Sequence, residues 1–74
     1  MTFQLWEAES ANLVGSYPTQ EAALAIVRDA ARTHGRDAVR SLVLVREDAR
    51  GRLTTLGEGD SLIDLALART APTT

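Results

Sequence analysis

The chain contains no cysteine and no lysine, and only three of its 74 residues are aromatic. Without cysteine, neither a disulfide nor a thiolate metal site can form, which fits a cytoplasmic location. No apolar run approaches the ~18 residues that a membrane-spanning helix needs. The N-terminus shows no basic region followed by an apolar run, so we expect no signal peptide. These absences favour a cytoplasmic protein without membrane contact.

The composition that remains is that of a small globular protein. Hydrophobic residues make up 45% of the chain and charged residues 24%, both ordinary values for a folded domain. We therefore expect one domain over residues 1–74, with residues 71–74 as a frayed tail. A core of this size is marginal, and burial between subunits is a common remedy.

Local patterns predict six main elements. The predicted strands are residues 2–8, 13–17, 40–47 and 52–56, and the predicted helices are residues 20–34 and 61–70. Thr19 fits the N-cap of the first helix and Gly35 its C-cap, while residues 48–51 form a turn. The order ββαββα indicates an α+β fold. We expect a four-stranded, mainly antiparallel sheet with two helices on one face.

Both predicted hairpins carry apolar residues on both faces. In the second hairpin, strict alternation puts Leu42, Leu44 and Leu53 on one face and Val43, Val45 and Leu56 on the other. In the first hairpin, Phe3, Leu5 and Val14 share one face, and Trp6, Leu13 and Tyr17 share the other. With a loop over residues 9–12, Trp6 is expected opposite Gly15. The alternation alone leaves open which face is the core.

Two helices can cover only one face of such a sheet, so we expect a second copy or another protein to cover the other. The helix 61–70 is apolar nearly all round, which is a second indication of a partner. The main helix carries its stripe on Ala23, Ile26, Val27, Ala30 and His34. The interface candidates are Trp6, Leu13, Tyr17, Val43, Val45, Leu56, Leu62 and Leu65.

No pattern of residues predicts a catalytic, cofactor-binding or metal site. The carboxylate pairs Glu7/Glu9 and Asp60/Asp64 lie at a strand end and a helix start, where charge is normally solvated. His34 is the single histidine and has no ligand set around it. Residues 57–59 are too short for a phosphate-binding loop. We therefore expect a protein that is not an enzyme and uses no cofactor.

The arginines are unevenly distributed along the chain. The net charge is −2, but residues 28–52 hold seven arginines against four acids. Arginine without lysine is typical of a GC-rich bacterial genome, and it also suits phosphate binding. If the arginines gather at one end of the domain, nucleic-acid binding or a regulatory accessory role becomes the alternative function. The candidate contacts are Arg28, Arg32, Arg36, Arg40, Arg50 and Arg52.

Part of the chain resembles a known type of domain. Residues 17–23 (Tyr-Pro-Thr-Gln-Glu-Ala-Ala) precede an alanine-rich helix, then Gly35, a strand and the turn Arg50-Gly51-Arg52. This arrangement resembles a small bacterial domain of unknown function over about residues 12–53. The resemblance implies a compact α+β module and no established activity. The sequence as a whole predicts a non-enzymatic association module, a homodimer joined through the free sheet face, the second helix or both.

Overall fold

The structure, a computed structural model, describes residues 1–70, with side chains as far as Ala68. The predicted frayed tail, residues 71–74, lies outside the described residues. The strands are β1 (Thr2–Glu7), β2 (Asn12–Tyr17), β3 (Leu42–Glu47) and β4 (Leu53–Glu58), and the helices are α1 (Gln20–His34), α2 (Arg36–Val39) and α3 (Gly59–Thr70). The four strands form one antiparallel sheet in the order β2-β1-β3-β4. The α+β class and the ββαββα order are confirmed, apart from the short helix α2.

Helix α1 begins and ends where the local signals predict. The Thr19 hydroxyl accepts a hydrogen bond from the Ala22 amide at 3.1 Å, which satisfies a free N–H group of the first turn. Gly35 ends the helix with φ 89°, a conformation that side chains with a Cβ disfavour. The residues of α1 that face the core are not all those of the predicted stripe. Ile26 is 40% exposed and His34 is also exposed.

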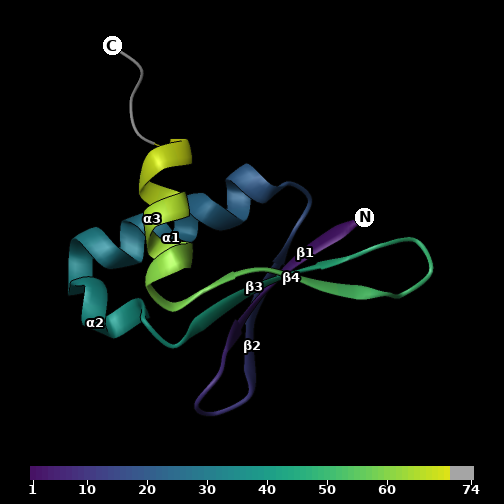
Figure 1. Cartoon of the computed structure of the whole chain (residues 1–74), viewed down its shortest axis with the longest axis horizontal. Coiled ribbons are helices and arrows are strands. Elements are labelled where there is room, and N and C mark those ends of the chain that lie inside the picture. Colours follow the sequence, from purple (N-terminus) through teal and green to yellow (C-terminus); the bar gives the residue numbers. More distant parts are fainter. Residues whose placement is uncertain (71–74) are drawn as a thin grey trace.

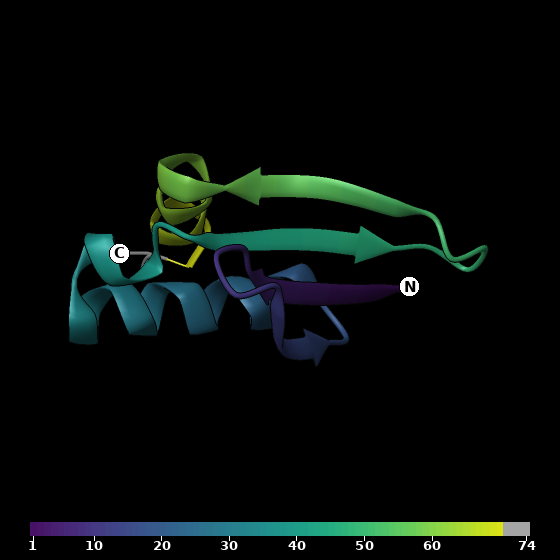
Figure 2. The same cartoon turned by 90° about the horizontal axis from the view of Figure 1, so that it is seen from below.

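The helices cover one face of the sheet. Leu5 of β1 and Leu44 of β3 are fully buried at the centre of that face. Helix α1 packs against β1 and β2, whereas α3 packs against β3 and β4 and also contacts α1. The fully buried side chains from the helices are Ala23, Leu24, Val27, Leu62, Ile63 and Ala66. Figures 1 and 2 show the helices together on one side of the twisted sheet, so the core lies in that single layer.

The predicted turn between β3 and β4 is confirmed. One carboxylate oxygen of Asp48 accepts hydrogen bonds from the amides of Arg50 and Arg52, both at 2.9 Å. Gly51 supplies the positive φ of 80° that this turn requires. The turn closes a hairpin whose far end extends beyond the helices (Figure 2).

An irregularity in the first hairpin corrects the predicted faces. The register shifts between Leu5 and Trp6, so Trp6 pairs with Leu13, and Leu5 rather than Trp6 pairs with Gly15. Because an extra residue reverses the alternation, Tyr17 shares the helix-covered face with Phe3. The side chain that covers Gly15 is that of Tyr17, since a Cβ there would lie 2.6 Å from its hydroxyl oxygen.

A second irregularity corrects the faces of the other hairpin. The register of β3 and β4 shifts between Leu44 and Val45. As a result Leu56 packs against the core. Strict alternation placed Leu53, and not Leu56, on the same face as Leu44. Leu53 lies opposite Glu47 on the face away from the helices and is 58% exposed.

Candidate association surface

The face of the sheet that carries no helix is called the open face. Across the sheet, paired residues on this face form three rows. The first row is Leu13, Trp6, Val43 and Glu58, the second is Ser16, Gln4, Val45 and Thr55, and the third is Thr2, Glu47 and Leu53. The rows give each side chain a defined neighbour on the adjoining strand.

An apolar stripe runs along the first row of the open face and continues to Val45 in the second row. It consists of Leu13, Trp6, Val43 and Val45, four of the residues predicted at an interface. Leu13 is 48% exposed, and the other three are half-buried by one another and their neighbours. All three helices pack elsewhere, so no element within residues 1–70 covers the stripe.

The polar groups beside the stripe are already paired within the open face. The indole Nε1 of Trp6 donates to the amide oxygen of Gln4 at 3.0 Å. The amide nitrogen of Gln4 in turn donates to the Glu47 carboxylate at 3.3 Å. A buried donor without an acceptor costs about 1–3 kcal/mol. This chain of hydrogen bonds avoids that cost when another surface covers Trp6 and Gln4.

The other four interface candidates lie on the covered side of the sheet. Leu62 is fully buried in the core, and Tyr17, Leu56 and Leu65 pack against it. The apolar character of α3 is explained within the chain, because the helix touches both α1 and the sheet. Leu62, Ile63 and Ala66 of α3 are thus used in the core, and Leu65 and Leu67 are partly buried against it.

The arginines of residues 28–52 do not gather at one end, as the alternative function required. Arg36 and Arg40 lie at the α2 end of the molecule, whereas Arg50 and Arg52 flank the hairpin turn at the opposite end (Figure 1). Arg28 pairs with Asp29 at 3.0 Å. Arg32 is exposed on α1, so the six candidate arginines are spread over α1, the α2 end and the hairpin turn.

The two arginines at the α2 end are held by acids of α2 and α3. Arg36 donates to Asp64 at 2.9 Å and to Asp60 at 3.4 Å. Arg40 donates to Asp60 at 3.3 Å and also to Asp37. The hydrogen bond that Arg36 donates to Asp64 is the main cause that raises the pKa of Arg36. The acid pair of α3 thus joins two helices through exposed ion pairs.

Glu7 organises the loop between β1 and β2. Its carboxylate accepts hydrogen bonds from the amide of Glu9 at 2.9 Å and from the amide and hydroxyl of Ser10 at 2.9 and 2.6 Å. These bonds, that of the Ser10 hydroxyl first, lower the pKa of Glu7 to about 2, with Ser41 contributing as well. A carboxylate that is hydrogen-bonded in its charged form has a depressed pKa. This geometry gives Glu7 a role in holding the turn.

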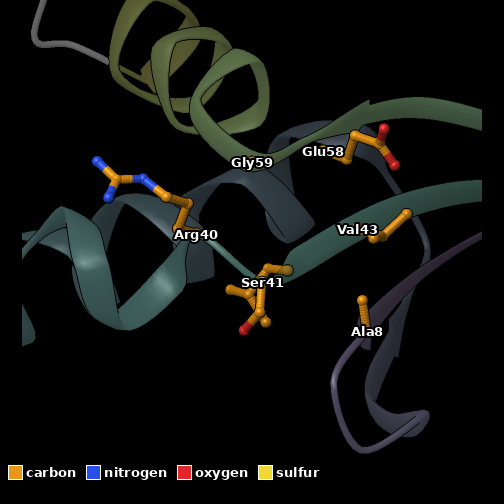
Figure 3. Close-up of a pocket in the computed structure, with 7 residues that line it drawn as sticks. Ala8, Arg40, Ser41, Val43, Glu58 and Gly59 are labelled. Atoms are coloured by element: carbon orange, nitrogen blue, oxygen red, sulfur yellow. The ribbon is translucent and has the colours of Figure 1, made fainter.

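A shallow hollow lies where β4 meets α3, at the edge of the open face. Its volume is about 340 Å³, and it is lined by Ala8, Arg40, Ser41, Leu42, Val43, Glu58 and Gly59. In Figure 3 the guanidinium of Arg40 and the carboxylate of Glu58 point away from each other. Within the described part of the chain, Glu58 takes part in no ion pair. The sequence did not indicate this hollow, because β4 was expected to end at residue 56.

Comparisons with known proteins add no functional evidence. No family model, no curated protein and no solved structure matches the chain. The resemblance noted for residues 12–53 therefore gains no support. The helices that the structure describes include none with the length and apolar content to cross a bilayer.

Proposed function

We propose that this protein is a non-enzymatic association module that forms a homodimer through its open sheet face. The observation that carries the proposal is the apolar stripe of Leu13, Trp6, Val43 and Val45. An antiparallel sheet with one face in water normally carries polar residues on that face. Here the solvent-facing side has the character of a second packing surface, and its polar neighbours are already hydrogen-bonded to each other.

The size of the open face indicates a reversible dimer. Strands of six residues with a rise of about 3.3 Å and a spacing of about 4.8 Å give a flat area of roughly 400 Å². Side chains increase the accessible area beyond this value. A standard stable interface buries about 800 Å² per partner. The flat area is about half of that value, so we expect a dimer that dissociates on dilution.

The setting that we propose is the bacterial cytoplasm. The cysteine-free composition and the use of arginine as the only basic side chain support this setting. In such a role the protein binds other molecules through the surfaces that the dimer leaves exposed.

Substitutions on and off the open face test the proposal. Leu13→Asp and Val43→Asp place a charge in the stripe, and Ile26→Asp is the matched control because Ile26 is exposed on α1, away from the stripe. Sedimentation velocity over a dilution series should show a dimer for the wild-type protein and the control. The two stripe variants should be folded monomers at the same concentrations. Equal self-association in all four proteins would contradict the proposal.

A further inference from the structure

The hairpin of β3 and β4 ends in two arginines, Arg50 and Arg52, whose amides bind the Asp48 carboxylate and whose side chains have no described acid as an ion-pair partner. Figure 2 shows this hairpin extending past the helices, so its turn is the part of the sheet farthest from them. Arg50 and Arg52 are exposed. Among residues 1–70, neither side chain takes part in an ion pair.

The other end of the same two strands carries the complementary charge. Glu58 closes β4 at the hollow, which Arg40 also lines. The guanidinium of Arg40 is held by Asp60 and Asp37 and points away from Glu58 (Figure 3). Arg52 and Glu58 are six residues apart on one chain, which at about 3.3 Å per residue places them about 20 Å apart. They cannot pair within a single copy. An acid and a base at opposite ends of one strand can pair twice between two copies that run in opposite directions.

The spacing along β3 fits such an arrangement. Consider a twofold axis that lies in the plane between the two packed sheets, passes over Val45 and runs at right angles to the strands. It places Glu47 over Val43 of the other copy, and residue 49 of the turn over Ser41 of the other copy, which lines the hollow. On β4, Leu53 then lies over Glu58 of the other copy, with Arg52 next to it. Packed sheets are about 10 Å apart, a gap that an extended arginine side chain can largely cross.

A second symmetric arrangement pairs fewer charges. A twofold axis parallel to the strands would stack Trp6 on Val43 of the other copy. It would, however, set Glu58 against Leu13, so the Glu58 carboxylate would lose water without gaining a base. It would also leave both hairpin arginines unpaired.

In the first arrangement the Glu47 carboxylate, which lies over Val43 of the other copy, keeps its hydrogen bond from Gln4. The charged groups of the open face are the carboxylates of Glu47 and Glu58, as far as the structure describes it, so the bases must come from outside the face. Like or unpaired charges at an interface suppress the wrong orientation.

We propose that the two copies pack their open faces with strands in opposite directions, so that the turn of residues 48–52 in each copy lies over the hollow of the other and Arg52 pairs with Glu58. This inference rests on the proposed homodimer and specifies its orientation. The occupant of the hollow is therefore the hairpin turn of a second copy.

Mixing two charge-reversed variants tests the orientation. Arg52→Glu alone and Glu58→Arg alone each convert both intersubunit pairs into like-charge contacts. Each should weaken dimerisation about tenfold at low salt, since two exposed pairs are lost and replaced by repulsion. An equimolar mixture of the two variants restores both opposite-charge pairs and should dimerise as tightly as the wild-type protein. The double variant carrying both changes in one chain should do the same. Arg32→Glu, on the exposed surface of α1, is the control and should change nothing.

The outcomes separate the two proposals. A wild-type dimer whose affinity is unchanged by either single variant, or that the mixture does not restore, overturns the orientation and leaves the open-face dimer standing. A wild-type protein that is monomeric at all concentrations overturns both. Circular dichroism of each variant confirms that the fold is intact.

Discussion

Two neighbouring residues of β3 should respond very differently to truncation, because they lie on opposite faces of the sheet. Leu44 is fully buried beneath the helices, so Leu44→Ala should cost about 3 kcal/mol, within the usual range of about 2–5 kcal/mol. Val43 is only half-buried on the open face. In the monomer, Val43→Ala should cost less than about 1 kcal/mol, since little area leaves the interior.

These values are large compared with the total stability. At roughly 0.05–0.15 kcal/mol per residue, a chain of this length has a free energy of unfolding of about 4–11 kcal/mol. Leu44→Ala should therefore lower the melting temperature by about 12 °C or more, given about 4–8 °C per kcal/mol for a domain of this size.

Urea unfolding, followed by circular dichroism at concentrations low enough for the monomer, measures both effects. The two variants should differ in the urea concentration at the unfolding midpoint. The slope of the unfolding free energy against urea concentration should be the same for both, as expected when stability alone changes. If Val43→Ala proves as costly as Leu44→Ala in the dilute protein, the assignment of the two faces is wrong.

Three further predictions concern the turns and the cap. Because the pKa of Glu7 is depressed, the stability that its carboxylate contributes is fully present above its ordinary pKa of 4.5 and is lost as the pH falls toward about 2. In Glu7→Gln, the urea concentration at the unfolding midpoint should depend less on pH over that range. If the midpoint of this variant depends on pH as in the wild-type protein, the loop does not depend on this carboxylate. Gly51→Ala should cost about 1 kcal/mol because φ is 80°, and Gly51→Asn should cost less in the same unfolding assay; equal losses would argue against positive φ as the cause. Thr19→Ala should lower the free energy of unfolding by about 1 kcal/mol, because the hydrogen bond from the Ala22 amide is lost. Thr19→Ser keeps a hydroxyl at this position and should lower the melting temperature much less. An equal decrease for both variants would rule out the cap.

The parts of the fold that local signals specify were predictable from the sequence. Thr19 and Gly35 delimit α1, and Asp48 with Gly51 delimits the hairpin turn, because each acts on backbone groups within a few residues. Helix α2 was not predicted, since a single turn is too short to show helical periodicity. Val39, which α2 carries into the core, gave no periodic pattern either.

The assignment of faces depended on features that a period-2 pattern cannot show. A bulge arises from how two strands pair, so counting along one strand placed Tyr17 and Leu56 on the wrong face. Trp6 and Leu13 were expected on one face and do pair there. Val43 and Val45 join them only through the pairing of β1 with β3, which the sequence does not specify.

The remainder of the candidate site depends on tertiary geometry. The hollow at Glu58 exists because β4 continues two residues beyond its predicted end. The separation of the arginines follows from the length of the β3–β4 hairpin, which carries Arg50 and Arg52 away from α2 (Figure 1). Neither distance along the chain nor composition reveals these placements.

The central claim is that the open face joins two copies of this chain. Its most direct test is the solution mass of the unmodified protein, measured by light scattering across a dilution series. We expect a mass near twice 8.0 kDa at high concentration, falling toward 8.0 kDa on dilution. A mass of 8.0 kDa at every concentration, up to the highest that can be reached, would contradict the claim.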